Sequence, residues 1–189
     1  GKLNLMLLTK ASRYFTIPYR IGYLGLGMLL FIGSYSAGAA MPLTDEDAEE
    51  IRSGFLEDIE NIDETGIFLN NLKVALAMFV PGVGVGLGIF SGLSTGEVYN
   101  AFALVTPSLA ATSPLSVLAT PFGILEVFAY GLAISRSGIL VAQLVKRAER
   151  KSWRQFSLVT AIEVAVVVAV LIAGSVVEFQ VISEADGQA

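Results

Sequence analysis

The chain has 189 residues, of which 54% are hydrophobic and only 15% are charged. Soluble domains carry nearer a quarter charged residues, so this composition excludes an ordinary water-soluble globule. The absence of Cys and His excludes disulfides, zinc or haem bound by these residues, and His-based catalysis. The net charge of −5 comes mostly from one acidic segment, and no basic face or motif indicates nucleic acid. We therefore expect an integral membrane protein that binds no nucleic acid.

Five apolar segments are predicted to cross the membrane as helices, because long runs almost free of charge are typical of membrane spans. These segments are residues 21–41, 67–93, 97–111, 122–145 and 156–177. The expected fold class is an all-α, polytopic bundle in which residues 1–189 form a single membrane domain. Small residues at the end of the first segment also fit a signal-peptide cleavage site, but we favour a retained span.

Residues 44–65 form the only strongly polar stretch, with ten acidic residues against one basic residue, Arg52. The apolar residues of this stretch recur at helical spacing, which predicts an amphipathic helix outside the membrane. These residues are Ala48, Ile51, Phe55, Ile59 and Ile62. Thr44 and Asp47 have the spacing of a capping box, and Gly66 is expected to end the helix. A disordered acidic linker is the alternative.

The second predicted span contains a proline and a run of glycines. Pro81 is expected to kink this helix near its middle. Gly84, Gly88 and Gly92 recur every four residues and provide a smooth face for close helix packing. A functional hinge or a pore lining is the alternative interpretation. A phosphate-binding loop is excluded, because no Lys followed by Ser or Thr comes after the glycines.

The apolar region between the second and fourth predicted spans is interrupted by prolines. They are Pro107, Pro114 and Pro121. Because a straight helix cannot continue through three prolines, we expect a broken segment over residues 112–120, either re-entrant or capping the outer face. Ser113 and Thr120 each precede a proline in the pattern of a helix cap followed by a first-turn proline.

The distribution of basic residues predicts the orientation in the cell membrane. Nine of the twelve Lys and Arg residues lie before the first span or within residues 146–154. Five spans put both groups on one side, which the positive-inside rule makes the cytoplasm. The N-terminus is then cytoplasmic, while the acidic helix and the C-terminus lie outside. The basic loop 146–154, with Trp153, is also suited to bind anionic lipid headgroups. The alternative is that the loop serves only to set the orientation of the protein.

Charged residues inside predicted spans are costly and are functional candidates by default. Arg136 and Glu163 are expected at similar depth near the inner side, where they form an ion pair that clamps two helices. A second polar layer is expected near the outer side. It comprises Asn70, Asn71, Lys73, Glu126 and Glu178. One lysine facing two carboxylates leaves an excess acid, which fits either a proton or cation site or a satisfied polar network.

Three short motifs occur in the order and spacing of a known family. They are Asn70-Asn71-Leu72-Lys73-Val74-Ala75, Pro121-Phe122-Gly123-Ile124-Leu125-Glu126 and Val177-Glu178-Phe179. Over roughly residues 15–182 the chain resembles the stage II sporulation protein M family, multi-pass membrane proteins of bacteria and archaea.

The resemblance also indicates which positions matter in this chain. The family's characteristic polar and small positions fall on Asn71, Gly123, Glu126 and Glu178. Phe122 departs from the family pattern, which commonly has His there, so no role for an imidazole carries over.

The resemblance implies a membrane scaffold, because in endospore formers the named member holds a cell-wall-degrading complex during engulfment without itself being the hydrolase. We therefore expect a non-enzymatic scaffold without cofactor or metal. It would self-associate through its glycine faces and hold a partner through residues 44–65. A small transporter or channel using Glu126 and Glu178 is the alternative. An intramembrane hydrolase is disfavoured, since no HExxH or GxSxG motif occurs.

Overall fold

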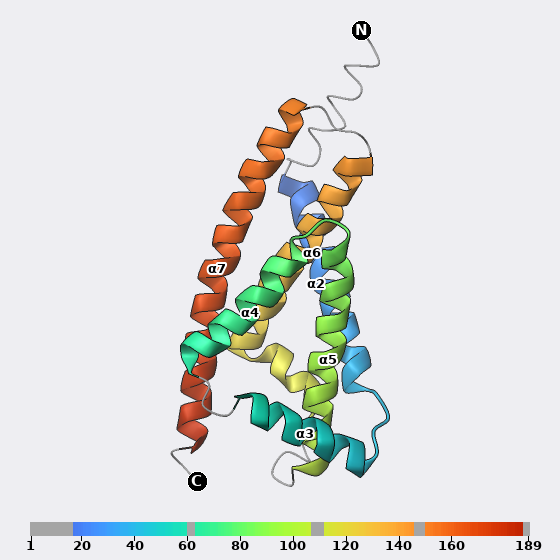
Figure 1. Ribbon diagram of the computed structural model, residues 1–189, viewed down its shortest axis with the longest axis vertical. Helices are drawn as coiled ribbons and strands as arrows, with labels where there is room; N and C mark the ends of the chain where they lie inside the picture. The colour runs from blue at the N-terminus through green and yellow to red at the C-terminus, as the bar shows by residue number, and fades with distance from the viewer. Residues whose placement is uncertain (1–16, 60–62, 107–111, 146–149, 187–189) are drawn as a thin grey trace.

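The computed structural model shows an all-helical protein, as the sequence predicts, within the part of the chain that it describes. That part comprises residues 17–59, 63–106, 112–145 and 150–186. The helices α2 (Ile17–Ala39), α6 (Pro121–Val145) and α7 (Arg150–Asp186) run lengthwise through the molecule (Figure 1). α6 packs against both of the others.

Three described segments are long and apolar enough to cross a membrane. They are Ile17–Ala39, Pro121–Val145 and Phe156–Gln180. These segments correspond to the spans predicted over residues 21–41, 122–145 and 156–177. The second of them is the most enclosed, with 67% of its most apolar stretch buried, against 28% and 22% in the others. α6 is therefore the central helix, and α2 and α7 present more apolar surface to the surroundings.

The two remaining predicted spans, residues 67–93 and 97–111, do not exist with those bounds. α4 covers Glu64–Met78 and α5 covers Val83–Val105. Figure 1 shows that the chain reverses its direction between these two helices, so that they form a hairpin. The prediction that residues 67–93 form one span is therefore wrong, because α4 ends and α5 begins within this range. The span predicted over 97–111 falls partly on α5, and its residues 107–111 lie outside the described part of the chain.

The turn of the hairpin is built by Pro81 and Gly82. Proline lacks the amide donor that a continuing helix needs. Gly82 has φ of 82°, a backbone conformation that residues with a Cβ rarely adopt. The expected kink at Pro81 is therefore a complete turn between two helices.

Four of the five glycines of α5 lie on one buried face, which packs against α4, α6 and α2. They are Gly84, Gly88, Gly92 and Gly96. A Cβ on Gly84 would overlap the carbonyl oxygen of Met78 in α4, and one on Gly88 would overlap the side chain of Ile134 in α6. Gly92 likewise lies against α2. This face is occupied within one chain, so it leaves no surface for the self-association that the sequence suggested.

The polar stretch predicted as one helix over residues 44–65 is divided between two helices. α3 (Asp45–Ile59) ends earlier, and Asp63 caps the start of α4 by accepting a hydrogen bond from the Gly66 amide at 2.8 Å. Gly66 therefore belongs to the first turn of α4 and does not end α3. The predicted capping box is present, since the Asp47 amide donates to Thr44 Oγ1 at 3.1 Å.

The broken segment before α6 is a short 3-10 helix, η1 (Pro114–Ala119), which Ser113 caps. α6 then begins at Pro121, where Thr120 Oγ1 accepts a hydrogen bond from the Gly123 amide at 3.1 Å. Both cap-and-proline patterns read from the sequence therefore mark real helix starts.

The two ends of the molecule differ in charge. At one end, α2 and α7 begin and α6 ends (Figure 1). The basic loop predicted over residues 146–154 is too long, because α7 already begins at Arg150. Residues 146–149 lie outside the described part, while residues 150–154 form the first turns of α7. We call this the basic end. We call the opposite end, across which α3 lies, the acidic end.

The close packing of α5 predicts a large difference between two neighbouring glycines. Gly84→Ala should destabilise the protein by about 1–3 kcal/mol, because the new methyl group meets backbone atoms of α4 that cannot move aside. Gly86→Ala is the matched control, since nothing lies within 4 Å of its added Cβ. Thermal unfolding in detergent should show a lower Tm for the first variant only. Equal Tm values for the two variants would contradict this packing.

Candidate functional site

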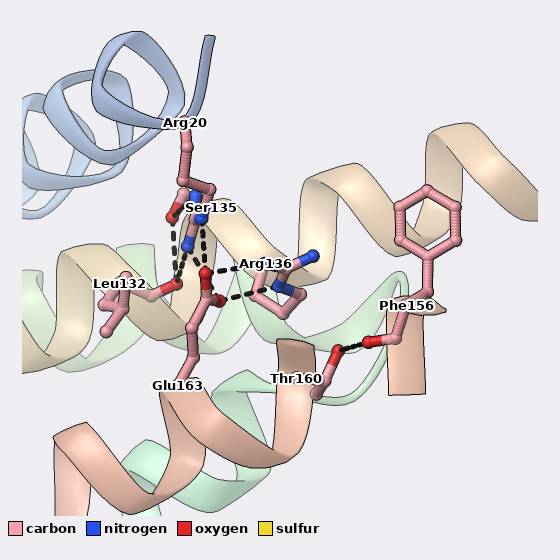
Figure 2. A network of polar contacts seen from close by, with 7 residues as sticks. All are labelled: Arg20, Leu132, Ser135, Arg136, Phe156, Thr160 and Glu163. Atoms are coloured by element: carbon pink, nitrogen blue, oxygen red, sulfur yellow. Dashed lines mark hydrogen bonds and ion pairs between the residues drawn. The ribbon is translucent and has the colours of Figure 1, made fainter. Parts of the chain in front are cut away.

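Near the basic end, two guanidinium groups hold one carboxylate (Figure 2). Arg136 of α6 donates from Nε and Nη2 to Glu163 of α7, each at 2.6 Å. Arg20 of α2 donates from Nε and Nη2 to the same carboxylate at 2.5 and 2.9 Å. The two residues predicted to pair therefore do so, and a second arginine joins them.

A serine completes this group of residues. Arg20 Nη1 donates to Ser135 Oγ at 2.9 Å, and Ser135 Oγ donates to the Leu132 carbonyl at 2.8 Å. We call Arg20, Ser135, Arg136 and Glu163 the arginine cluster. It connects all three candidate spans and carries two positive charges against one negative charge.

Sequence reasoning missed Arg20, which it treated only as a charge flanking the first span. The sequence does place both residues toward the same side of the membrane. Arg20 directly precedes one apolar run, and Glu163 lies seven residues inside another that begins at residue 156. Counting both arginines at that level would have suggested that they share one acid. The cluster is a clamp between helices, and its excess positive charge also favours an anion nearby.

A second polar group lies between the hairpin, α6 and α7, toward the acidic end. Asn71 Nδ2 of α4 donates to Glu126 Oε1 of α6 at 2.6 Å. Glu178 of α7 lies within electrostatic range of Glu126, and its Oε2 atom is buried without a hydrogen-bond partner. The structure therefore brings together three of the five residues predicted for the outer layer.

Asn70 and Lys73 do not belong to this group, because both are exposed. Lys73 follows Asn71 by two positions, which places it about 200° around the helix. When Asn71 faces α6, Lys73 must face away from it. The expectation that a lysine lies between the two carboxylates is therefore wrong, and no ion pair joins Lys73 to a described residue.

Tyrosines surround the two carboxylates and were missed by the sequence reading. Tyr99 of α5 and Tyr130 of α6 lie within electrostatic range of both Glu126 and Glu178. Nothing in the sequence separates such tyrosines from ordinary aromatic residues of a membrane helix. We call Asn71, Tyr99, Glu126, Tyr130 and Glu178 the carboxylate layer.

The single amide donor of the carboxylate layer, Asn71, serves Glu126 and leaves Glu178 Oε2 without a partner. Two acids with one donor have the composition of a site for one proton or one monovalent cation. Among the described residues, no group of three or more Asp, Glu, His or Cys side chains is arranged to hold a metal ion.

The residues carried over from the resemblance meet at this place. Asn71, Glu126 and Glu178 are in the layer, and Gly123 lies one turn before Glu126, where a Cβ would overlap the Val117 carbonyl. The family model described as Stage II sporulation protein M matches residues 24–179.

The chain belongs to the stage II sporulation protein M family. The match includes the whole carboxylate layer and the pair of Arg136 and Glu163, while Arg20 lies before its first residue. Neither a curated protein nor a solved structure matches the chain. Membership of the sporulation protein M family therefore rests on the family model, and the arrangement of the polar groups comes from the chain's own structure.

The arginine cluster predicts an order of stability among three variants. Glu163→Gln should cost about 3–5 kcal/mol, because it leaves two guanidinium groups without their carboxylate. Arg20→Gln should cost less, about 1.5–3 kcal/mol, since Glu163 keeps Arg136. Arg154→Gln, an exposed residue at the same end, should stay within about 0.5 kcal/mol of the wild type. Unfolding in detergent measures all three, and an Arg20→Gln variant as unstable as Glu163→Gln would contradict the shared-carboxylate account.

Proposed function

We propose that this member of the sporulation protein M family is a non-enzymatic membrane scaffold that holds a partner protein at its acidic end. The proposal rests on the way in which α3 is held: its apolar side packs on α5, while its acidic side is exposed. A helix fixed in this way presents a charged surface in a constant position, as a docking site requires.

Several contacts fix α3 on the bundle. Ala48 is fully buried, and Phe55 packs edge-on against Phe102 of α5 at a ring-centroid distance of 5.6 Å. Asn100 of α5 donates to the Met41 carbonyl at 2.8 Å, which holds the chain just before α3. The helix is therefore attached at its start and along its apolar side.

The opposite side of α3 is strongly acidic. Its exposed carboxylates are Asp45, Glu46, Asp47, Glu49, Glu50, Glu57 and Asp58, which we call the acidic face. Hydrogen bonds from Thr44 hold the pKa of Asp47 below its usual range, and Arg52 does the same for the pKa of Glu49. Charge complementarity favours a partner with a basic surface.

The proposal includes an orientation in the cell membrane. α2, α6 and α7 cross it completely, while the hairpin of α4 and α5 enters from the acidic end and turns back. The number of complete crossings is then odd, so the two termini lie on opposite sides of the membrane. By the positive-inside rule, the basic end is the cytoplasmic one. The acidic face and the C-terminus lie outside, where an extracytoplasmic partner can reach them. A homo-oligomer of this scaffold would have to form through surfaces other than the glycine face.

Cysteine labelling tests this orientation cleanly, because the chain has no cysteine of its own. Ser53→Cys, exposed on α3, should react with a membrane-impermeant maleimide in intact cells. Lys146→Cys, in the basic loop, should react only after the membrane is permeabilised. The reverse pattern, or labelling of both variants in intact cells, would contradict the proposed orientation.

Partner capture tests the scaffold itself. The wild-type protein, purified from its native membranes in mild detergent, should retain a partner at fixed stoichiometry in native mass spectrometry. A variant with Glu46, Glu50 and Glu57 changed to Gln should lose the partner while keeping its fold, because these side chains are exposed.

The matched control for that experiment removes acidic charge from the same end without touching α3. Glu184→Gln combined with Asp186→Asn, near the end of α7, should keep the partner. Unchanged capture by the α3 variant, or a wild-type protein that purifies without any partner, would refute the scaffold proposal.

A second candidate function is transport of a proton or a monovalent cation through the carboxylate layer. It is favoured by Glu178, whose buried Oε2 atom has no hydrogen-bond partner and lies near Glu126. Unpaired acids at membrane depth often mark ion pathways. Glu126→Gln should then abolish ion flux in liposomes without changing assembly, whereas equal flux would remove Glu126 from any such mechanism.

A further inference from the structure

The arginine cluster leaves hydrogen-bond donors without acceptors on the side away from Glu163. Arg136 Nη1 and Gln143 Nε2 are both buried and have no hydrogen-bond partner, and the two residues are only 1% and 2% exposed. They are seven positions apart on α6, which places them two turns apart on one face of the helix.

Figure 2 shows that the free terminal nitrogen of Arg136 points away from Glu163, toward the side on which Phe156 lies. A buried N–H group without an acceptor is costly, so two of them on one helix face indicate that an acceptor is missing. The cluster also has one positive charge in excess, because Glu163 is the one carboxylate among the described residues that pairs with Arg20 and Arg136. An anion that carries several acceptor oxygens would satisfy both deficits at once.

The surroundings indicate where in the membrane this position lies. Phe156 packs with Ile139 and Leu140 of α6, and Trp153 lies against the same group, with its ring 6.3 Å from that of Phe156. Tryptophan is enriched at the level of the lipid headgroups. Gln143 lies one turn from Ile139 and Leu140, so its free donor is near this level. Arg136 lies two turns of α6 deeper in the membrane.

We propose that Arg136 and Gln143 bind one phosphate-type oxyanion at the basic end of each chain. The Nη1 atom of Arg136 and the Nε2 atom of Gln143 donate to phosphate oxygens, while Nε and Nη2 of Arg136 remain on Glu163. Arginine suits this task because its planar group can serve a carboxylate and a phosphate together. The phosphate belongs either to a phospholipid headgroup or to free inorganic phosphate, which present the same oxygens.

This proposal is independent of the scaffold role, since it concerns the opposite end of the molecule. Loss of partner capture at α3 would leave it unaffected, and loss of anion binding would leave the acidic face intact. The two proposals can therefore fail separately.

The test uses the delipidated full-length protein in a maltoside detergent, titrated with phosphatidylglycerol and read by native mass spectrometry. One lipid per chain should be retained by the wild type. Gln143→Leu removes a donor without changing any charge and should weaken this binding about tenfold. Arg154→Gln, which removes an exposed positive charge at the same end, should leave the affinity unchanged. Equal binding by Gln143→Leu, or loss only in Arg154→Gln, would show general electrostatic attraction and overturn the proposal.

A second variant and a second probe complete the test. If Gln143→Leu does not fold, Arg136→Lys keeps a positive charge beside Glu163 but removes the forked donor group, and it should show a similar loss of binding. Inorganic phosphate, titrated without lipid, separates the two sources of the oxyanion. A raised Tm in the wild type but not in the variant would identify the free ion as a ligand, and retention of phosphatidylglycerol alone would identify the headgroup. Binding of neither probe to the wild type would refute the site.

Discussion

The structure depends on one carboxylate that serves two arginines. Glu163 of α7 pairs with Arg136 of α6 and Arg20 of α2. It therefore ties together the three helices of the described part of the chain that are apolar enough to cross a membrane. Apolar side chains alone do not fix such helices, because lipid tails are as apolar as a leucine side chain. A buried ion pair is costly to form, but once formed it is still more costly to break. The cluster therefore sets the relative depth of α2, α6 and α7, and the remaining elements pack on this frame.

The hairpin of α4 and α5 fills the space that this frame leaves. Glycines on α5 allow its backbone to approach α2 and α4 more closely than larger residues would permit. The same insertion brings Asn71 of α4 to Glu126 of α6 and positions the end of α5 beneath α3. The carboxylate layer and the acidic face are thus consequences of one packing arrangement. A polar group within the bundle and an exposed acidic face can have different roles in the same fold.

Much of this arrangement could be predicted from the sequence, and the failures have physical reasons. Hydropathy located α2, α6 and α7, and proline caps located the starts of η1 and α6. Hydropathy could not reveal the hairpin of α4 and α5, because the residues on both sides of Pro81 are apolar and the turn depends on the positive φ of Gly82. The similar depth of Arg136 and Glu163 in their spans was enough to predict that they pair. The direction in which Lys73 points could not be predicted in this way, because it depends on how α4 is rotated about its own axis. Which face of a short helix turns inward is decided by packing, which an apolar sequence does not display.

The central claim is that the bundle holds α3 as a docking surface at the acidic end. Cryo-electron microscopy of the complex purified from native membranes tests this claim most directly. The account predicts density for the partner against the exposed carboxylates of α3, with the contact between α3 and α5 unchanged. Density that touches only the basic end, or only the outer surface of α7, would contradict it.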